Sequence, residues 1–365
     1  GAVVVTVAYR LGVFGFFAHP ALAAEDGVPA ANFALHDLRA AFHWVRKHIA
    51  AFGGDPERVT AFGESAGALN LVDLLTASRG GEAAPFQRLV LQSLGGSLSE
   101  RQSLAEEQAT GKTLIGHLGL PGEISAQRIR NLPAADLLAA VGMLPEGHYH
   151  DGVIDGHLLT AAPAEILAGS DLADLELIVG TNADEWLMYL PPDSGEAELE
   201  AWIGTHALDS AEALKALLED EPDPRRRLDR LRTAREMQCP SLWLAGRVSA
   251  AGGSGRAYHF RKVRAGVGGK KLGAYHGAEL PYVFATHDDW LPTDSADRRL
   301  TAAMQAYWLT FARTGDADAP GQPAWPLFRD DAPKLLVFGD VITPARSRAG
   351  ALCDLLGPVT PVVSP

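Results

Sequence analysis

The residues whose types and spacing could do chemistry centre on Ser65. It lies in the pentapeptide Gly63-Glu64-Ser65-Ala66-Gly67, between a short apolar run and an Ala/Leu-rich run. The pattern G-x-S-x-G is typical of a nucleophile elbow, where a serine sits on a sharp, strained turn from a strand into a helix. Small neighbours let the chain fold back there, and the N–H of Ala66 would point toward a forming oxyanion. A glycine-rich turn with a chance serine is the alternative, which the flanking strand and helix patterns disfavour.

A nucleophilic serine needs a base within hydrogen-bond reach and an acid that orients the base. In doubly wound hydrolases these residues follow in the order serine, acid, histidine. Glu185 directly follows a predicted strand and is the preferred acid, with its neighbour Asp184 as the alternative. His276 lies before Gly277 in a loop of small residues after a later strand, and is the preferred base. Seven other histidines lie on predicted helices or strands or out of order, and we expect them to be surface or packing residues: His19, His36, His43, His48, His148, His150 and His259.

These residues must be positioned by strands whose carboxyl ends share one edge of a sheet. Besides the nucleophile strand, apolar or alternating runs predict five strands, at residues 2–9, 88–92, 175–179, 256–261 and 335–338. Apolar spacings of three and four predict amphipathic helices at 35–49 and about 297–313. The alternation predicts an α/β fold with a mostly parallel central sheet flanked by helices. The alternation is lost over residues 97–172, which we expect to form a helical insertion over the active site. Because no linker divides the chain, residues 1–365 are predicted to form a single domain.

Composition narrows the possible partners. The 365 residues carry a formal net charge of −13, with 47% hydrophobic and 21% charged residues. The negative charge argues against nucleic acid or an anionic membrane as partners and suits a small neutral substrate. No apolar run reaches the roughly 20 residues of a membrane helix. The two cysteines, Cys239 and Cys353, are expected to be buried free thiols that favour a cytoplasmic protein, with one long-range disulfide as the alternative.

Segments spread along the chain resemble the type-B carboxylesterase family of the α/β-hydrolase fold, which includes bacterial esterases and cholinesterases. The tyrosine-arginine strand exit lies in residues 5–16, and the longest signature runs from Trp44 through Gly67. Four further segments follow in family order, at residues 153–156, 175–185, 275–281 and 308–316. One such match is weak evidence, but six in order are specific.

The resemblance implies an ester hydrolase that acts through an acyl-serine intermediate, with no metal or cofactor. Ser65 would be the nucleophile, Glu185 the acid and His276 the base, with one oxyanion N–H from Ala66. A binding or adhesion relative without activity is a rival on the same fold, although this chain retains all three triad residues. An amidase or carbamate hydrolase with the same triad is a second rival, because leaving-group preference depends on pocket shape.

Two further residues are candidates for the substrate pocket. Glu64 would face the pocket beside the nucleophile, or else be a plain solvated carboxylate. Ser93 is a hydrogen-bond candidate there or a simple turn serine, since Leu94 stands where the family usually has glycine. Around Asn32 and Asp37 the glycines and the glutamine that are usual in the family are replaced by other residues. We expect these replacements to affect local packing and not the catalytic residues.

The sequence opens directly into an apolar run after Gly1. We therefore expect an upstream segment that holds the family's glycine-rich oxyanion loop and the strand between residues 2–9 and the nucleophile strand. If so, the lack of a signal peptide in these residues says nothing about where the protein is located. The 365-residue chain alone is then expected to be an inefficient esterase with exposed strand edges.

Overall fold

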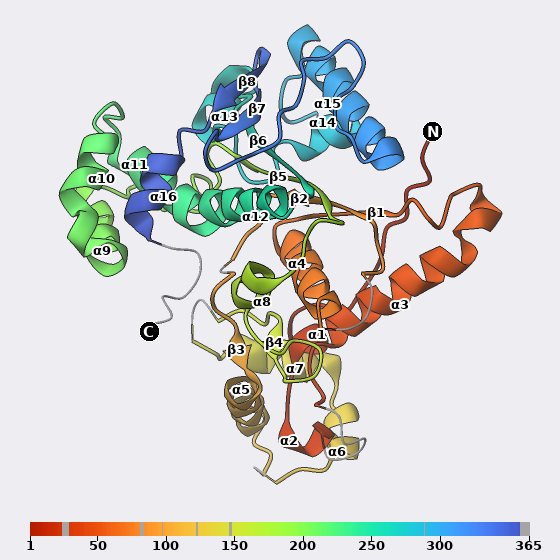
Figure 1. Ribbon diagram of the computed structural model, residues 1–365. Helices are drawn as coiled ribbons and strands as arrows, with labels where there is room; N and C mark the ends of the chain where they lie inside the picture. Colours follow the sequence, from red (N-terminus) through yellow and green to blue (C-terminus); the bar gives the residue numbers. More distant parts are fainter. Residues whose placement is uncertain are drawn as a thin grey trace.

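The computed structural model describes residues 1–23, 29–80, 84–96, 98–121, 123–145, 148–287 and 289–357. It confirms the predicted α/β architecture, with a central sheet flanked by helices (Figure 1). The sheet has six strands in the order β1-β2-β5-β6-β7-β8, namely β1 Thr60–Glu64, β2 Arg88–Gln92, β5 Glu176–Asn182, β6 Ser254–Phe260, β7 Lys334–Phe338 and β8 Ile342–Arg346. All neighbouring pairs are parallel except β7 and β8, which form an antiparallel pair.

The apolar runs of the inner strands are explained by cover on both faces of the sheet. Successive residues of a strand point to opposite faces. Leu177 and Val179 of β5 accordingly join one core cluster, whereas Ile178 between them joins another. The first cluster includes residues of helices α4 (Ala66–Ser78) and α12 (Cys239–Ala250), and the second includes residues of α15 (Ser295–Thr314). A parallel sheet covered in this way holds the ends of its strands rigidly enough to carry a site.

The other helices surround this sheet or lie in the segment between β2 and β5. They are α1 Gly12–Phe16, α2 Pro20–Ala23, α3 Phe33–His48, α5 Leu104–His117, α6 Ala126–Arg130, α7 Ala134–Val141, α8 Pro163–Gly169, α9 Glu196–His206, α10 Ala211–Leu217, α11 Pro224–Thr233, α13 Gly266–Leu272, α14 Leu280–Phe284 and α16 Gly350–Leu356. Short 3-10 turns lie at Ile49–Phe52 and Leu208–Ser210, and one π-helical turn at Ala234–Gln238. None of the described helices combines the length and the apolar character needed to cross a membrane.

Between β2 and β5 the chain forms a helical region that shares a small core with the amino-terminal part. Two short parallel strands, β3 (Gln102–Ser103) and β4 (Val153–Ile154), lie within it beside α5 (Figure 1). Leu114 and Ile115 of α5 pack in one cluster with Val13 and Phe17 of the amino-terminal part. This region is therefore attached through contacts with residues far away in sequence.

The prediction of a strand at residues 2–9 is not confirmed, because this segment forms no ladder with any described strand. Val4 is 62% exposed, and the first sheet strand, β1, pairs only with β2 among the described strands. A groove of about 1160 Å³ is lined by residues that include Val3 and Val5 of this segment and Ala61 and Gly63 of β1. Extended backbone without a hydrogen-bonded neighbour cannot form a β ladder.

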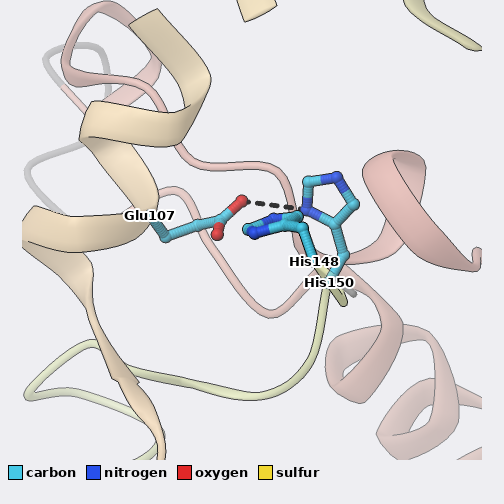
Figure 2. Close-up of side chains that lie close together, drawn as sticks. All are labelled: Glu107, His148 and His150. Atoms are coloured by element: carbon cyan, nitrogen blue, oxygen red, sulfur yellow. Dashed lines mark hydrogen bonds and ion pairs between the residues drawn. The ribbon is translucent and has the colours of Figure 1, made fainter. Parts of the chain in front are cut away.

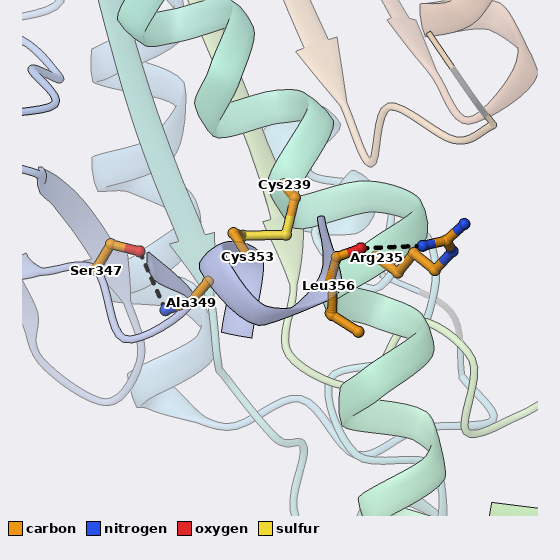
Figure 3. The surroundings of a disulfide bond; sticks show 6 residues. All are labelled: Arg235, Cys239, Ser347, Ala349, Cys353 and Leu356. Carbon is orange, nitrogen blue, oxygen red and sulfur yellow. Dashed lines mark hydrogen bonds between the residues drawn. A yellow bond between two sulfur atoms is a disulfide. The ribbon is translucent and has the colours of Figure 1, made fainter. Parts of the chain in front are cut away.

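The prediction of two free thiols is wrong, because Cys239 and Cys353 form a disulfide with their Cα atoms 5.5 Å apart. The bond joins the start of α12 to α16, at a sequence separation of 114 (Figure 3). The side chain of Arg235 also donates to the carbonyl of Leu356 at 3.1 Å. The carboxyl-terminal helix is thus attached covalently and by a hydrogen bond to the core helices.

Candidate active site

The turn at Ser65 has the backbone strain expected of a nucleophile elbow. Ser65 has φ 55° and ψ −122°, and it stands between β1 and the first residue of α4. Its N–H donates to the carbonyl of Gln92 at 2.9 Å, which holds the turn against β2. A Cβ on Gly63 would come within 2.6 Å of the backbone of Gly67, so the expected need for a small residue holds at Gly63. At Gly67 an added Cβ would meet no described atom within 4 Å.

Ala66 is the first residue of α4, so its N–H is one of the amino-terminal N–H groups with no partner inside the helix. The helix dipole adds partial positive charge at this end. An oxygen that becomes negative beside Ser65 would therefore meet a favourable potential at Ala66.

His276 lies in the loop between α13 and α14, where its Nδ1 is 2.7 Å from Oε2 of Glu185. Glu185 is fully buried just beyond the end of β5. Its Oε1 accepts the hydroxyl of Ser93 at 2.7 Å and the N–H of Asn182 at 2.5 Å. Because Glu185 accepts hydrogen bonds, a neutral His276 beside it carries its proton on Nδ1. Nε2 is then unprotonated and can act as a base.

The free nitrogen of His276 faces Glu64 in this structure. Nε2 lies 3.2 Å from Oε1 of Glu64, the residue before Ser65. Among the described residues no hydrogen bond joins Nε2 to the hydroxyl of Ser65. Tyr189 packs edge-on against the imidazole, with the ring centroids 6.0 Å apart. His276 and Glu185 thus contact each other, and the contact made by Nε2 is with Glu64, the residue before Ser65.

The charges around His276 shift its titration and that of Glu64. Burial raises the pKa of Glu64 to about 7, against the opposing effect of His276, while the carboxyls of Glu279 and Glu185 push it further up. Burial would lower the pKa of His276, but the hydrogen bond and charge of Glu185 outweigh it and raise that pKa overall, with help from Glu64 and Glu279. The side chain of Glu64 is only 22% exposed. Glu64 is therefore not a plain solvated carboxylate.

Asp184, the alternative acid, points to different partners. Its Oδ2 accepts the N–H of Ala274 at 2.8 Å, and its Oδ1 faces Arg226 at 3.3 Å. Its own N–H donates to the carbonyl of Ala274 at 3.0 Å. Asp184 thus fastens the loop that carries His276, and its side chain is only 17% exposed.

Ser93 is not a simple turn serine, because its hydroxyl bonds the buried carboxyl group of Glu185. It is fully buried with φ 47°, and its hydroxyl donates to Glu185 as described above. Its N–H donates to the carbonyl of Gly180 at 2.7 Å. Ser93 therefore acts on the acid of the site from the end of β2.

Sequence reasoning missed a second buried carboxyl group behind the first. Glu279 is fully buried, and it accepts from Gln92 at 2.8 Å and from Asn182 at 2.6 Å. Burial raises its pKa, and the charge of Glu185 raises it further. The only signal in the sequence is the position of Glu279 three residues after His276.

Comparison with known proteins agrees with this geometry. The family model described as "Carboxylesterase family" matches residues 1–344. The chain is 32% identical to fumonisin B1 esterase of Sphingopyxis macrogoltabida, over 94% of this chain and 64% of that protein. It is 29% identical to para-nitrobenzyl esterase of Bacillus subtilis, over 93% of this chain and 70% of that protein. The chain thus spans just under two thirds of the length of the first of these relatives.

Two solved structures share the fold over almost the whole chain. A PNB esterase superposes with a TM-score of 0.78 at 26% identity, covering 96% of this chain and 73% of that one. The carboxylesterase EST55 of Geobacillus stearothermophilus superposes with a TM-score of 0.80 at 28% identity, covering 96% and 74%. The family match, the relatives and the shared fold lead to one conclusion: the chain belongs to the carboxylesterase family.

Proposed function

We propose that this protein hydrolyses carboxylic esters, with Ser65 as nucleophile, His276 as general base and Glu185 as the acid that orients the base. The observation that carries the proposal is the 2.7 Å contact between Nδ1 of His276 and the buried carboxylate of Glu185, next to a serine on a strained turn. The names of the relatives, fumonisin B1 esterase and para-nitrobenzyl esterase, support esters as the substrate class.

In the proposed reaction, Nε2 of His276 turns from Glu64 to the hydroxyl of Ser65 and takes its proton. The serine oxygen attacks the ester carbonyl, and the tetrahedral oxyanion is stabilised by the N–H of Ala66 and further donors. The imidazolium, held by Glu185, then gives its proton to the alcohol that leaves. Water, deprotonated by His276, cleaves the acyl-serine and releases the acid.

The substrate is proposed to be a small neutral ester. Two buried or half-buried carboxyl groups, Glu64 and Glu185, already lie at the site. A negatively charged group next to the scissile bond would meet their repulsion in a medium that screens charge poorly. We therefore expect anionic esters to be poorer substrates than neutral ones of the same size.

The test measures hydrolysis of a series of para-nitrophenyl esters and covalent labelling by a serine-directed phosphonate. Ser65→Ala should abolish labelling and lower turnover on the order of 10⁶-fold, as loss of the triad serine does in subtilisin. Ser78→Ala is the matched control, because Ser78 lies at the far end of α4 and its hydroxyl donates to the carbonyl of Leu75. A folded chain in which the phosphonate does not label Ser65 would instead favour a non-catalytic relative.

A further inference from the structure

Away from the proposed active site, three side chains that can bind metals converge in the region between β2 and β5. They are Glu107 of α5 and the two histidines His148 and His150 of the segment before β4 (Figure 2). None of the three takes part in the reaction proposed above. Figure 2 shows the Glu107 carboxylate and the two imidazoles directed toward one another.

The polar atoms of this cluster are buried and only partly paired. Glu107 is 1% exposed, and the side chain of His150 is 4% exposed. Oε2 of Glu107 and Nε2 of each histidine are buried without a hydrogen-bond partner among the described residues. A buried polar atom without a partner costs free energy, so these unpartnered atoms leave the cluster able to accept a ligand.

The distances suit a single small cation. One ligand atom from each of the three residues lies within 4.8 Å of the others. Nδ1 of His150 is 3.1 Å from Oε1 of Glu107, and the two imidazole centroids are 4.8 Å apart at 83°. Bonds of about 2.0–2.1 Å in a tetrahedral site place ligands roughly 3.3 Å apart, so no pair has to close by more than about 1.5 Å.

The residue between the two histidines, Tyr149, lies outside the cluster. Tyr149 is 73% exposed, whereas His150 on one side of it is buried against Glu107. The sequence His148-Tyr149-His150 thus places two imidazoles on the inner side and one phenol in solvent.

We propose that Glu107, His148 and His150 bind a divalent transition-metal ion of the zinc type, with water in the fourth position. Two imidazoles and one carboxylate suit zinc, whereas magnesium and calcium prefer oxygen ligands. Three protein ligands leave an open coordination position, which is typical of sites that are not closed structural cages. The metal would join α5 to the segment that leads into β4.

The experiment titrates the metal-free full chain, without a histidine tag, with Zn²⁺ alone and then with Co²⁺. We expect one equivalent of Zn²⁺ to bind and to raise the melting temperature. Co²⁺ should give the visible absorption of a low-coordinate site with nitrogen ligands, and Zn²⁺ should displace it. His148→Gln and Glu107→Gln should each weaken binding at least about tenfold. His43→Gln, which removes an exposed histidine of α3, should leave binding unchanged.

Circular dichroism of each metal-free variant establishes that it is folded. If Glu107→Gln fails to fold, His148→Gln and the Co²⁺ spectrum of the unaltered chain still decide the question. The proposal is overturned if the folded chain binds no Zn²⁺, or if both variants bind it as tightly as the control. Because binding is measured without an ester, the result is independent of whether Ser65 is catalytic.

Discussion

Nε2 of His276 lies 3.2 Å from Oε1 of Glu64, the residue that immediately precedes Ser65. The proposed base is therefore held between two carboxyl groups, with Glu185 at 2.7 Å from its other nitrogen. His276 can accept the proton of Ser65 only when its Nε2 carries no proton, and the charge of Glu64 favours the protonated imidazole. Glu64 is thus expected to set the pH at which the base becomes available.

Glu64→Gln should move the acidic limb of the pH–rate profile to lower pH. The negative charge of Glu64 helps to raise the pKa of His276, so its removal lowers that pKa. A general base is active when neutral, and activity rises with pH through the pKa of the base. The lower pKa therefore brings the limb to lower pH, as measured by kcat/KM between about pH 5 and pH 9.

Glu57→Gln is the control for this profile, because Glu57 is an exposed carboxyl whose side chain is 77% accessible. It should leave the limb in place. A limb that moves upward in Glu64→Gln, or does not move, would show that Glu64 does not influence the base.

Glu185→Gln should lower kcat far more than Asp184→Asn. The N–H of Asn182 occupies one oxygen of Glu185 at 2.5 Å, so a glutamine amide must turn its NH₂ toward Nδ1 of His276. This forces the proton of His276 onto Nε2, where the ring can no longer act as a base. An acid-to-amide change of this kind costs about 10⁴-fold in kcat.

Asp184→Asn keeps an acceptor for the N–H of Ala274 but loses the pairing with Arg226. We expect a modest loss of thermal stability and a kcat within about tenfold of the unaltered chain, since an ion pair of this exposure contributes on the order of 1 kcal/mol. Steady-state kinetics and melting curves of both variants provide the comparison. The opposite ranking in kcat would mean that Asp184 is the acid.

Replacing both cysteines by serine should destabilise the folded state. The Cys239–Cys353 bond closes a loop with a sequence separation of 114. A crosslink of this span reduces the entropy of the unfolded chain, which corresponds to roughly 5 kcal/mol in the chain-entropy model and typically about 2–4 kcal/mol in practice. Urea unfolding of the unaltered chain and of the double variant measures the difference.

Thiol titration of the unfolded chain gives an independent check, because an intact bond leaves no reactive thiol. Equal free energies of unfolding together with two reactive thiols would show that the bond does not form in solution. Reduction of the unaltered chain should reproduce the lower stability of the double variant.

Much of the sheet can be predicted because buried parallel strands are continuous apolar runs. The sequence pattern locates the runs at β2, β5, β6 and β7, and the structure confirms them. The pattern misses β8, because Thr343 and Pro344 in its middle are exposed and it pairs on only one side. Residues 2–9 have the composition of a strand, but composition cannot supply the neighbour that a ladder needs.

For the site, the order of motifs identifies residues, but the contacts between them need three dimensions. Glu185 and Asp184 are adjacent in sequence, and only the structure shows which one reaches His276. Glu279 has no signature of its own, because burial of a carboxyl group depends on what packs around it. The sequence likewise gives no reason to pair His150 with Glu107, which lies 43 positions earlier.

The last prediction concerns Asp229, a fully buried carboxyl group near the proposed acid. Its Oδ1 accepts the N–H of Trp186 at 2.8 Å, while its Oδ2 has no hydrogen-bond partner among the described residues. Burial raises the pKa of Asp229 from 3.8 to about 8, and the charge of Asp184 adds to this shift. The folded protein therefore binds a proton that the unfolded chain has released throughout the range from about pH 4 to pH 8.

Where the folded state binds more protons than the unfolded state, stability falls as pH rises. Asp229 should thus lower the free energy of unfolding between about pH 4 and pH 8 by at most about 1.4 kcal/mol per pH unit. Asp229→Asn removes this contribution, so the variant should gain stability relative to the unaltered chain as pH rises from about 5 to about 8. Urea unfolding at each pH measures this difference, in which the shared effects of Glu64 and Glu279 cancel. Asp209→Asn, at an exposed position, should show no such trend. A pH-independent difference for Asp229→Asn would mean that Asp229 is already ionised in the folded protein at the acidic end of this range.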